Sequence, residues 1–469
     1  MLWPRVSVID GTAGRTTAMK RRNAMKRRGQ FCDGVQRRDF LRVGSGSLFG
    51  TAVSLSGMLA GQAGATTNAT AKDDRSVIIV FLKGGLSTID TFDMKPDAPV
   101  EFRGDFDPIA SNVPGIQVGE HMPRTAQQQD KFSLIRSFGH RNSDHGPADH
   151  YMLTGYHPVA GFNAGLTPNN QRPAHGSIIA KKLGPRGSVP PYVCVPDMHP
   201  SAGSAYLGPS VSPFSVNADP ADPGFAVRDI VPPLDLAARR LDARRSLLAQ
   251  VDRFQRGAER LANKRANAVS TFRDKAFQLM TSPEAKRAFN IHAEADKLRD
   301  EYGRNSLGQS CLMARRLVEA GVRCITIDHV DWDTHDNNFV TLKRDLLPHL
   351  DAAMSTLFRD LSERGLLEKT LVIVTGEFGR TPRINKNAGR DHWGPGFTVM
   401  IGGGGVQGGR VVGKSNERAE RPAENPIGPE DLAATLHHLL GVNTKDEFHT
   451  AEGRPVTIVN DGRVVRELL

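Results

Sequence analysis

The segment "SVIIVFL" (76–82) decides the fold class of this chain. It is a continuous apolar run, mostly β-branched, that ends at Gly84-Gly85, which is typical of a strand buried on both faces of a parallel sheet. The segments "VRCITID" (322–328) and "TLVIVTGEFG" (370–379) repeat this pattern, and they follow stretches with helical spacing at 306–321 and 342–365. Residues 429–441 also have helical spacing. This alternation predicts an α/β fold with a doubly wound, mainly parallel sheet covered by helices on both faces.

Further segments extend the prediction along the chain. "FSLIRSF" (132–138) and "PYVCVP" (191–196) are strand candidates. We expect one sheet to contain the strands at 76–82, 322–328, 370–376 and 397–402. Residues 234–302 are charged, rich in Ala, Arg and Leu, and poor in Pro, which predicts a helical insertion within an α/β domain that spans residues 76–469.

The first 65 residues have the features of an export signal. "QRRDFLR" (36–42) places two arginines before Phe and Leu, an interrupted apolar stretch follows, and "AGA" (63–65) offers a small-residue cleavage site. A transmembrane anchor is disfavoured because the apolar stretch is poor in large aliphatic residues. We therefore expect a twin-arginine signal peptide over residues 1–65, with Met25 as an alternative start, then a linker over 66–75. The mature protein is expected in the periplasm or cell envelope, without a stable membrane span.

The net charge of +10 is concentrated in this signal, because 11 of the 61 Lys and Arg residues lie in the first 65 positions. The remainder of the chain is close to neutral, which argues against a nucleic-acid partner. The mature chain keeps Cys194, Cys311 and Cys324, without CxxC spacing. At most one disulfide can form, and a zinc-finger module is excluded.

Polar side chains gather directly after the predicted strands, in "GGLSTIDTFDMKP" (84–96), "DHVDWDTHDNN" (328–338) and "GEFGRTPRINKNAGRDHW" (376–393). The carboxyl ends of strands in an open α/β sheet are where ligands bind. Carboxylates and imidazoles are ordinary ligands of divalent metals. Any single Asp/His pair fits a capped turn equally well, and the histidines alone fit a polar network at the rim of the sheet. Several pairs together predict a zinc, manganese or calcium site with candidate ligands Asp333, His335, Glu377, Asp391, His392 and His140.

Several blocks resemble one family: "GGLSTIDTFDMKPDAP", "HGPADHYMLTGYHP", "WDTHDNN", "TGEFGRTPRINKNAGRDHW" and "PEDLAATLHHLLG". They look like successive blocks of the exported domain-of-unknown-function family numbered 1501, and the resemblance extends from about residue 76 to 469. It implies an alkaline phosphatase/sulfatase-like fold with a metal-dependent site at the strand ends. It implies no particular reaction.

The chain departs from the pattern of the sulfatases at the position of the nucleophile. Sulfatases carry C-x-P-S-R-x-x-L-L-T-G, in which the Cys becomes formylglycine. The corresponding stretch "HGPADHYMLTG" (145–155) has His145 in place of that Cys and Asp149 in place of the Arg, which excludes formylglycine chemistry here. The first strand ends in Lys83 where the superfamily usually has a metal-binding Asp, and Phe378 stands where a metal-binding His is usual.

Four residues remain as candidates for catalysis. We expect His145 to be a metal ligand or the general base for an attacking water. A hydroxyl nucleophile could come from Ser87 or Ser143. Arg380 is expected to hold the anionic group of the substrate, with Arg383 and Arg390 as further guanidinium partners.

Two functions are compatible with these features. The first is a metal-dependent hydrolase of sulfate or phosphate esters, whose substrate is an anionic small molecule or a polysaccharide. The second is a non-catalytic envelope protein that binds an anionic glycan or a protein partner in the same cleft. The missing Asp after the first strand favours the second function, and the acidic, imidazole and guanidinium groups at the strand ends favour the first.

Overall fold

The computed structural model describes residues 74–227 and 281–469. The expected signal peptide (1–65), nearly all of the linker (66–75) and most of the helical insertion (234–302) lie outside the described residues. The described end of the insertion contains helices α9 (Pro283–Phe289) and α10 (Asp296–Tyr302). Within the described ranges, no helix is both long and apolar enough to cross a membrane.

The described residues form one eight-stranded sheet with the order β12-β4-β11-β8-β1-β7-β5-β6. Strand β1 lies inside this sheet and pairs in parallel with β7 and β8. Strand β11 runs antiparallel to both of its neighbours, β8 and β4. The predicted mainly parallel sheet is confirmed, and all four expected strands belong to it. The strands are β1 (Ser76–Leu82), β4 (Phe132–Phe138), β5 (Tyr192–Val195), β6 (Phe214–Ser215), β7 (Cys324–His329), β8 (Thr370–Thr375), β11 (Phe397–Gly402) and β12 (Val411–Val412).

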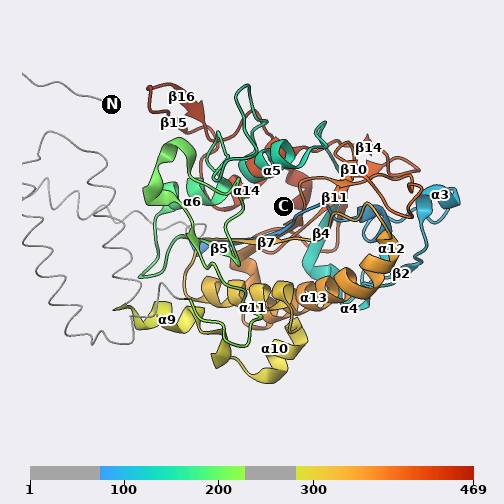
Figure 1. Cartoon of the computed structure of the whole chain (residues 1–469), viewed down its shortest axis with the longest axis horizontal. Coiled ribbons are helices and arrows are strands. Elements are labelled where there is room, and N and C mark those ends of the chain that lie inside the picture. Colours follow the sequence, from blue (N-terminus) through green and yellow to red (C-terminus); the bar gives the residue numbers. More distant parts are fainter. Residues whose placement is uncertain (1–73, 228–280) are drawn as a thin grey trace, which may run out of the picture. The chain divides into compact units, whose positions relative to one another are not determined.

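Helices cover the two faces of the sheet (Figure 1). Because side chains of a strand alternate between its faces, Ile78, Val80 and Leu82 of β1 join one hydrophobic cluster and Val77, Ile79 and Phe81 join another. The first cluster includes side chains from α11 (Ser306–Glu319) and α13 (Leu347–Glu363). The second includes side chains from α5 (His145–Thr154), α6 (His175–Leu183) and α14 (Pro429–Leu439). All seven residues of β1 are buried, as the unbroken apolar run predicts.

The described residues also form short strand pairs and short helices outside this sheet. Two-stranded pairs form from β2 (Pro108–Ala110) with β3 (Gln117–Gly119), β9 (Gly379–Arg380) with β10 (His392–Trp393), β13 (Lys414–Ser415) with β14 (Pro422–Glu424), and β15 (Glu447–His449) with β16 (Pro455–Thr457). Short helices are α3 (Val100–Arg103), α4 (Pro123–Ala126) and α12 (Asn338–Thr341). The β9–β10 pair follows β8 directly, so it lies next to the carboxyl edge of the sheet.

The turn after β1 brings two segments of the chain into close contact. Gly84 has a φ of +110°, and a Cβ atom at this position would lie 2.4 Å from the main-chain nitrogen of Asp333. Only glycine tolerates both the positive φ and this approach. The turn after β1 is therefore packed against the loop after β7, and this contact fixes where Asp333 stands.

Candidate metal centre

Helix α5 places His145 at the carboxyl edge of the sheet. The helix begins at His145 and ends at Thr154, followed by Gly155, whose φ of +73° is the left-handed conformation that commonly terminates helices. Nδ1 of His145 lies 2.6 Å from Oε1 of Glu377, which follows β8. Both carboxylate oxygens of Glu377 also accept the N–H of Gly84, at 2.9 and 3.0 Å. The fully buried Glu377 thus ties α5 to the turn after β1.

The contact with Glu377 sets the tautomer of His145. Burial raises the pKa of Glu377, but its oxygens accept hydrogen bonds from Gly84 and His145, which favour the charged carboxylate. The hydrogen bond to Glu377 in turn raises the pKa of His145. Because a carboxylate only accepts, Nδ1 of His145 carries the proton, and Nε2 is the nitrogen that faces Asp333.

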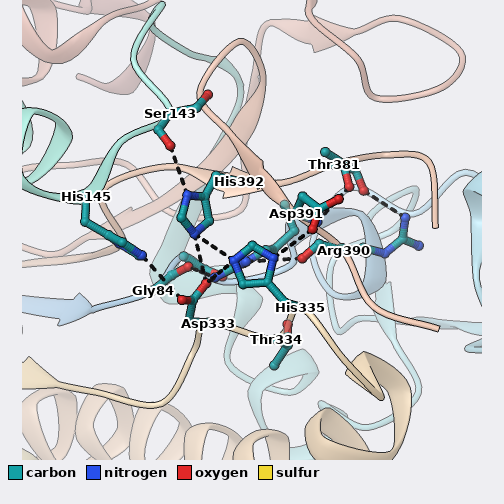
Figure 2. Close-up of polar contacts among 12 residues, drawn as sticks. Gly84, Ser143, His145, Asp333, Thr334, His335, Thr381, Arg390, Asp391 and His392 are labelled. Atoms are coloured by element: carbon teal, nitrogen blue, oxygen red, sulfur yellow. Dashed lines mark hydrogen bonds and ion pairs between the residues drawn. The ribbon is translucent and has the colours of Figure 1, made fainter. Parts of the chain in front are cut away.

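Asp333 stands at the centre of three imidazoles (Figure 2). Its Oδ1 lies 3.0 Å from Nε2 of His335 and 3.0 Å from Nε2 of His392. Its Oδ2 lies 3.4 Å from Nε2 of His145. Ligand atoms of His145, Asp333 and His392 all lie within 4.8 Å of one another. We call these three residues together with His335 the metal centre, as the group of side chains that could hold a metal ion.

The other two imidazoles are oriented in the same way as His145. Nδ1 of His335 lies 2.7 Å from Oδ1 of Asp391, and Nδ1 of His392 lies 2.9 Å from the main-chain oxygen of Ser143. Oxygens of these kinds accept hydrogen bonds, so in the neutral rings Nδ1 carries the proton and Nε2 a lone pair. Nε2 of His335 and Nε2 of His392 are nevertheless only 3.0 Å apart. Two lone pairs at this distance repel each other, and a shared cation removes the repulsion.

This arrangement matches the way in which proteins prepare imidazoles for metals. Metal-binding histidines usually donate the second ring N–H to a carboxylate or a carbonyl. Here three different rings have such an acceptor at Nδ1, namely Glu377, Asp391 and the carbonyl of Ser143. Glu377 and Asp391, which we expected to bind the metal, instead hold its candidate ligands in place. The residues present therefore fit a divalent cation.

Arg380 does not have the expected role of holding a substrate anion. Its guanidinium is fully buried, and it donates to the main-chain oxygens of Gly84, Gly85 and Arg390 and to Oδ1 of Asp333. Burial alone would raise the pKa of Asp333, but the hydrogen bond and charge of Arg380 lower it to about 2. Arg380 thus keeps Asp333 ionised, and it has no donor directed at a substrate.

The guanidinium of Arg390 likewise donates to groups within the protein, whereas Arg383 is exposed. The buried guanidinium of Arg390 makes two hydrogen bonds of 2.8 Å to Asp90. Ser87 donates to the same carboxylate at 2.6 Å and is itself buried. Ser87 therefore belongs to a structural network, which corrects its expected role as a nucleophile.

Ser143 and His140 also differ from expectation. Ser143 contributes its carbonyl to His392, while its hydroxyl accepts the N–H of Gly394 at 3.0 Å. Nε2 of His140 donates to the main-chain oxygen of Glu377 at 2.7 Å, and its Nδ1 accepts the N–H of Asn142 at 3.2 Å. Burial lowers the pKa of His140 to about 4. Both ring nitrogens are occupied, so His140 supports the strand end and does not join the metal centre.

Solved structures similar to this chain share little of its sequence. No curated protein matches the chain. Among solved structures, Ps i-CgsB in complex with k-i-k-neocarrahexaose is 13% identical, with a TM-score of 0.35, over 79% of this chain and 72% of that one. PsFucS1 sulfatase from Pseudoalteromonas sp. is 14% identical, with a TM-score of 0.33, over 78% and 68%. A protein in the alkaline phosphatase superfamily from Vibrio parahaemolyticus is 10% identical, with a TM-score of 0.39, over 78% and 66%. Likeness at this level assigns no reaction to this chain.

The sequence itself gives the stronger match. The model of one family covers residues 74–469, which include all described residues and most of the chain. The chain therefore belongs to the family described as "Protein of unknown function (DUF1501)".

Proposed function

We propose that the chain is a metal-dependent hydrolase of sulfate or phosphate esters that works without a formylglycine nucleophile. The observation that carries the proposal is the metal centre, in which three imidazoles with fixed tautomers direct Nε2 towards the carboxylate of Asp333. A set of three nitrogens and one carboxylate favours zinc or manganese over calcium, which prefers oxygen ligands.

Asp333, His145, His392 and His335 would hold the ion. When bound, a divalent ion polarises an ester oxygen and lowers the pKa of a bound water. The protein contributes the fixed geometry: Glu377 and Asp391 keep the proton on Nδ1 of two imidazoles, and Arg380 keeps Asp333 charged. The side chains of Asp333 and His145 are 42% and 37% exposed, so the centre is open to a substrate and to water.

Water is the nucleophile that this arrangement favours. Ser87 is buried against Asp90, and the hydroxyl of Ser143 is engaged by Gly394. His145 stands where sulfatases carry their nucleophile, but its Nδ1 is bound by Glu377 and its Nε2 faces Asp333, where it would hold the ion. The reaction would then be a single displacement in which water attacks the sulfur or phosphorus and the alcohol leaves.

A direct test is a screen for ester hydrolysis with and without metal. The mature protein would be assayed on chromogenic sulfate and phosphate monoesters after chelation and after return of zinc or manganese. We expect metal-dependent hydrolysis that the variant His392→Ala loses and the variant His449→Ala, altered at an exposed histidine of β15, retains. Hydrolysis that survives both chelation and His392→Ala would contradict the proposal.

A second candidate function is a non-catalytic envelope protein that binds an anionic glycan in the same place. It is favoured by the buried state of Arg380 and Arg390, which leaves neither guanidinium to stabilise a transition state. This candidate predicts binding of an anionic glycan without turnover in the same assay. It shares with the hydrolase the proposed twin-arginine export to the cell envelope.

A further inference from the structure

A hollow of about 290 Å³ opens beside the metal centre. Its lining includes Phe102, Arg383, Ile384, Asp391 and Trp393. Asp391 connects the hollow to the metal centre, because its Oδ1 accepts the N–H at Nδ1 of His335 at 2.7 Å (Figure 2). The volume lies just below the range for small-molecule sites, about 300–1,000 Å³. A group the size of one sugar ring therefore fits next to Asp391, which holds the candidate metal ligand His335 in place.

Aromatic side chains form part of the wall of the hollow. Trp393 of β10 donates its indole N–H to the main-chain oxygen of Glu420 at 2.8 Å, which fixes the plane of the ring. Phe102 of α3 is almost fully buried, so it is also held in place. Fixed aromatic side chains with a few polar groups around them are common in small-molecule sites, and the ring of Trp393 suits the apolar face of a sugar ring.

Two cationic side chains lack a protein acceptor among the described residues: Arg383, which lines the hollow, and Arg418, which contacts Phe102 of its lining. The guanidinium of Arg418 lies over the ring of Phe102, 5.0 Å from its centroid. Arg383 lines the hollow and is exposed. In the part of the chain that the structure describes, neither guanidinium makes a hydrogen bond or an ion pair. Their donors remain available, in contrast to those of Arg380 and Arg390.

The carboxylates near the hollow are already engaged. Asp391 accepts from His335 and Asn385, and Glu420 accepts from Asn416 at 2.9 Å. A guanidinium binds a sulfate or a carboxylate through two parallel hydrogen bonds. Arg383 and Arg418 can therefore take an anionic group that lies outside the metal centre.

We infer that the hollow binds a neighbouring sugar residue of a polyanionic glycan, with Arg383 and Arg418 holding a second sulfate or carboxylate group. The ester to be cleaved, or simply bound, would lie at the metal centre. A small monoester would leave both guanidinium groups unused. The inference rests on the proposed function for the place of the ester, and it narrows the substrate to glycans with more than one anionic group.

The test is equilibrium binding of a polysulfated hexasaccharide to the mature protein at one fixed salt concentration. We expect the double variant Arg383→Ala/Arg418→Ala to bind at least about tenfold more weakly, a factor that corresponds to about 1.4 kcal/mol. The matched control is Arg454→Ala, because Arg454 lies beside β16, at the end of the molecule away from α3 and β10 (Figure 1). The variant Arg383→Lys/Arg418→Lys keeps the charge and should recover part of the affinity. The same hexasaccharide after desulfation, and polyglutamate, should bind weakly to the wild type.

Three results would overturn the inference: unchanged affinity in the double variant, an equal loss in Arg454→Ala, or equally tight binding of polyglutamate or the desulfated chain. Hydrolysis of small monoesters by the wild type is measured separately. Binding that depends on Arg383 and Arg418, without any hydrolysis, supports the inference and contradicts the proposed hydrolase function. Hydrolysis together with unchanged glycan affinity in the double variant supports the proposed hydrolase function and contradicts the inference.

Discussion

At the scale of the residue, the carboxylates behind the imidazoles matter as much as the imidazoles. Asp391 holds Nδ1 of His335, and Glu377 holds Nδ1 of His145. Each carboxylate fixes one tautomer, and each makes its ring a stronger metal ligand. The sequence singled out both acids as ligands because Asp and Glu after a strand are ordinary metal-binding residues. The structure gives them a supporting position instead.

This position predicts the effect of Asp391→Asn on metal affinity. The amide cannot offer a charged acceptor to Nδ1 of His335, so we expect metal affinity to fall about 10- to 100-fold. Affinity for zinc would be measured by competition with a chelator. The control is Asp336→Asn, since Asp336 is exposed in the same loop. An affinity that falls equally in both variants would show that Asp391 has no special link to the metal centre.

Gly84 supports a second prediction at this scale. Gly84→Ala places a Cβ atom 2.4 Å from the nitrogen of Asp333, on a backbone with a φ of +110°. We expect a lower free energy of unfolding, by more than the roughly 1 kcal/mol that a left-handed non-glycine residue costs. The matched control is Gly365→Ala, which has a φ of +66° and no atom within 4 Å of the added Cβ. Equal destabilisation of the two variants in urea unfolding would argue against the close approach.

At the scale of the element, helices and strands follow the sequence pattern closely. The expected helical stretches at 306–321 and 429–441 are α11 and α14, each two residues shorter at its end. The stretch expected from 342 begins with a π-helical turn, Leu342–Leu346, before α13. Hydrophobic spacing predicts that a helix exists, but the exact hydrogen-bond register depends on packing that the local sequence does not contain.

Helices α6 and α14 meet through a buried pair of histidines. Nδ1 of His175 lies 3.3 Å from Nε2 of His437. Burial lowers the pKa of His175 to about 4 and that of His437 well below its usual value. A lowered pKa means that the folded state favours the neutral form of each histidine. The free energy of unfolding is therefore highest above the ordinary histidine pKa of about 6.5, and it falls as the pH falls towards 4.

We therefore expect the free energy of unfolding to fall between pH 7.5 and pH 5 by about 2 kcal/mol for each such histidine. His437→Gln should lower stability at pH 7.5 and should make the fall towards pH 5 smaller. The control His449→Gln, at an exposed histidine, should keep the wild-type pH dependence. A His437→Gln variant that loses as much stability as the wild type over this range would contradict the account of this pair.

At the scale of the whole molecule, the sheet could be predicted from the sequence, but the hydrogen-bond partners within the site could not. Buried strands leave unbroken apolar runs, so the location of the carboxyl edge and the gathering of Asp333, His335 and His392 there follow from the sequence. The partners of Arg380 could not be predicted, because they are main-chain oxygens of Gly84 and Gly85, which carry no sequence signal. The same holds for the carbonyl of Ser143 at His392.

The expected export signal gives one prediction. If Arg37 and Arg38 direct twin-arginine export, their replacement by lysine should leave the precursor in the cytoplasm. The measurement is fractionation of cells followed by detection of precursor and mature chain. A matched change of Arg27 and Arg28 to lysine, which keeps the QRRDFLR motif intact, should leave export unchanged. Mature protein that still reaches the envelope in the first variant would rule out this route.

The metal content of the purified mature protein tests the central claim most directly. Elemental analysis should find about one equivalent of a divalent ion in the wild type, because a prepared set of deprotonated ligands binds metal tightly. Asp333→Ala should lose the ion while its circular dichroism shows a folded chain, and the control Asp336→Ala should keep it. A folded wild type without bound metal, even after incubation with zinc or manganese, would contradict the claim, and so would an Asp333→Ala variant that retains the full equivalent.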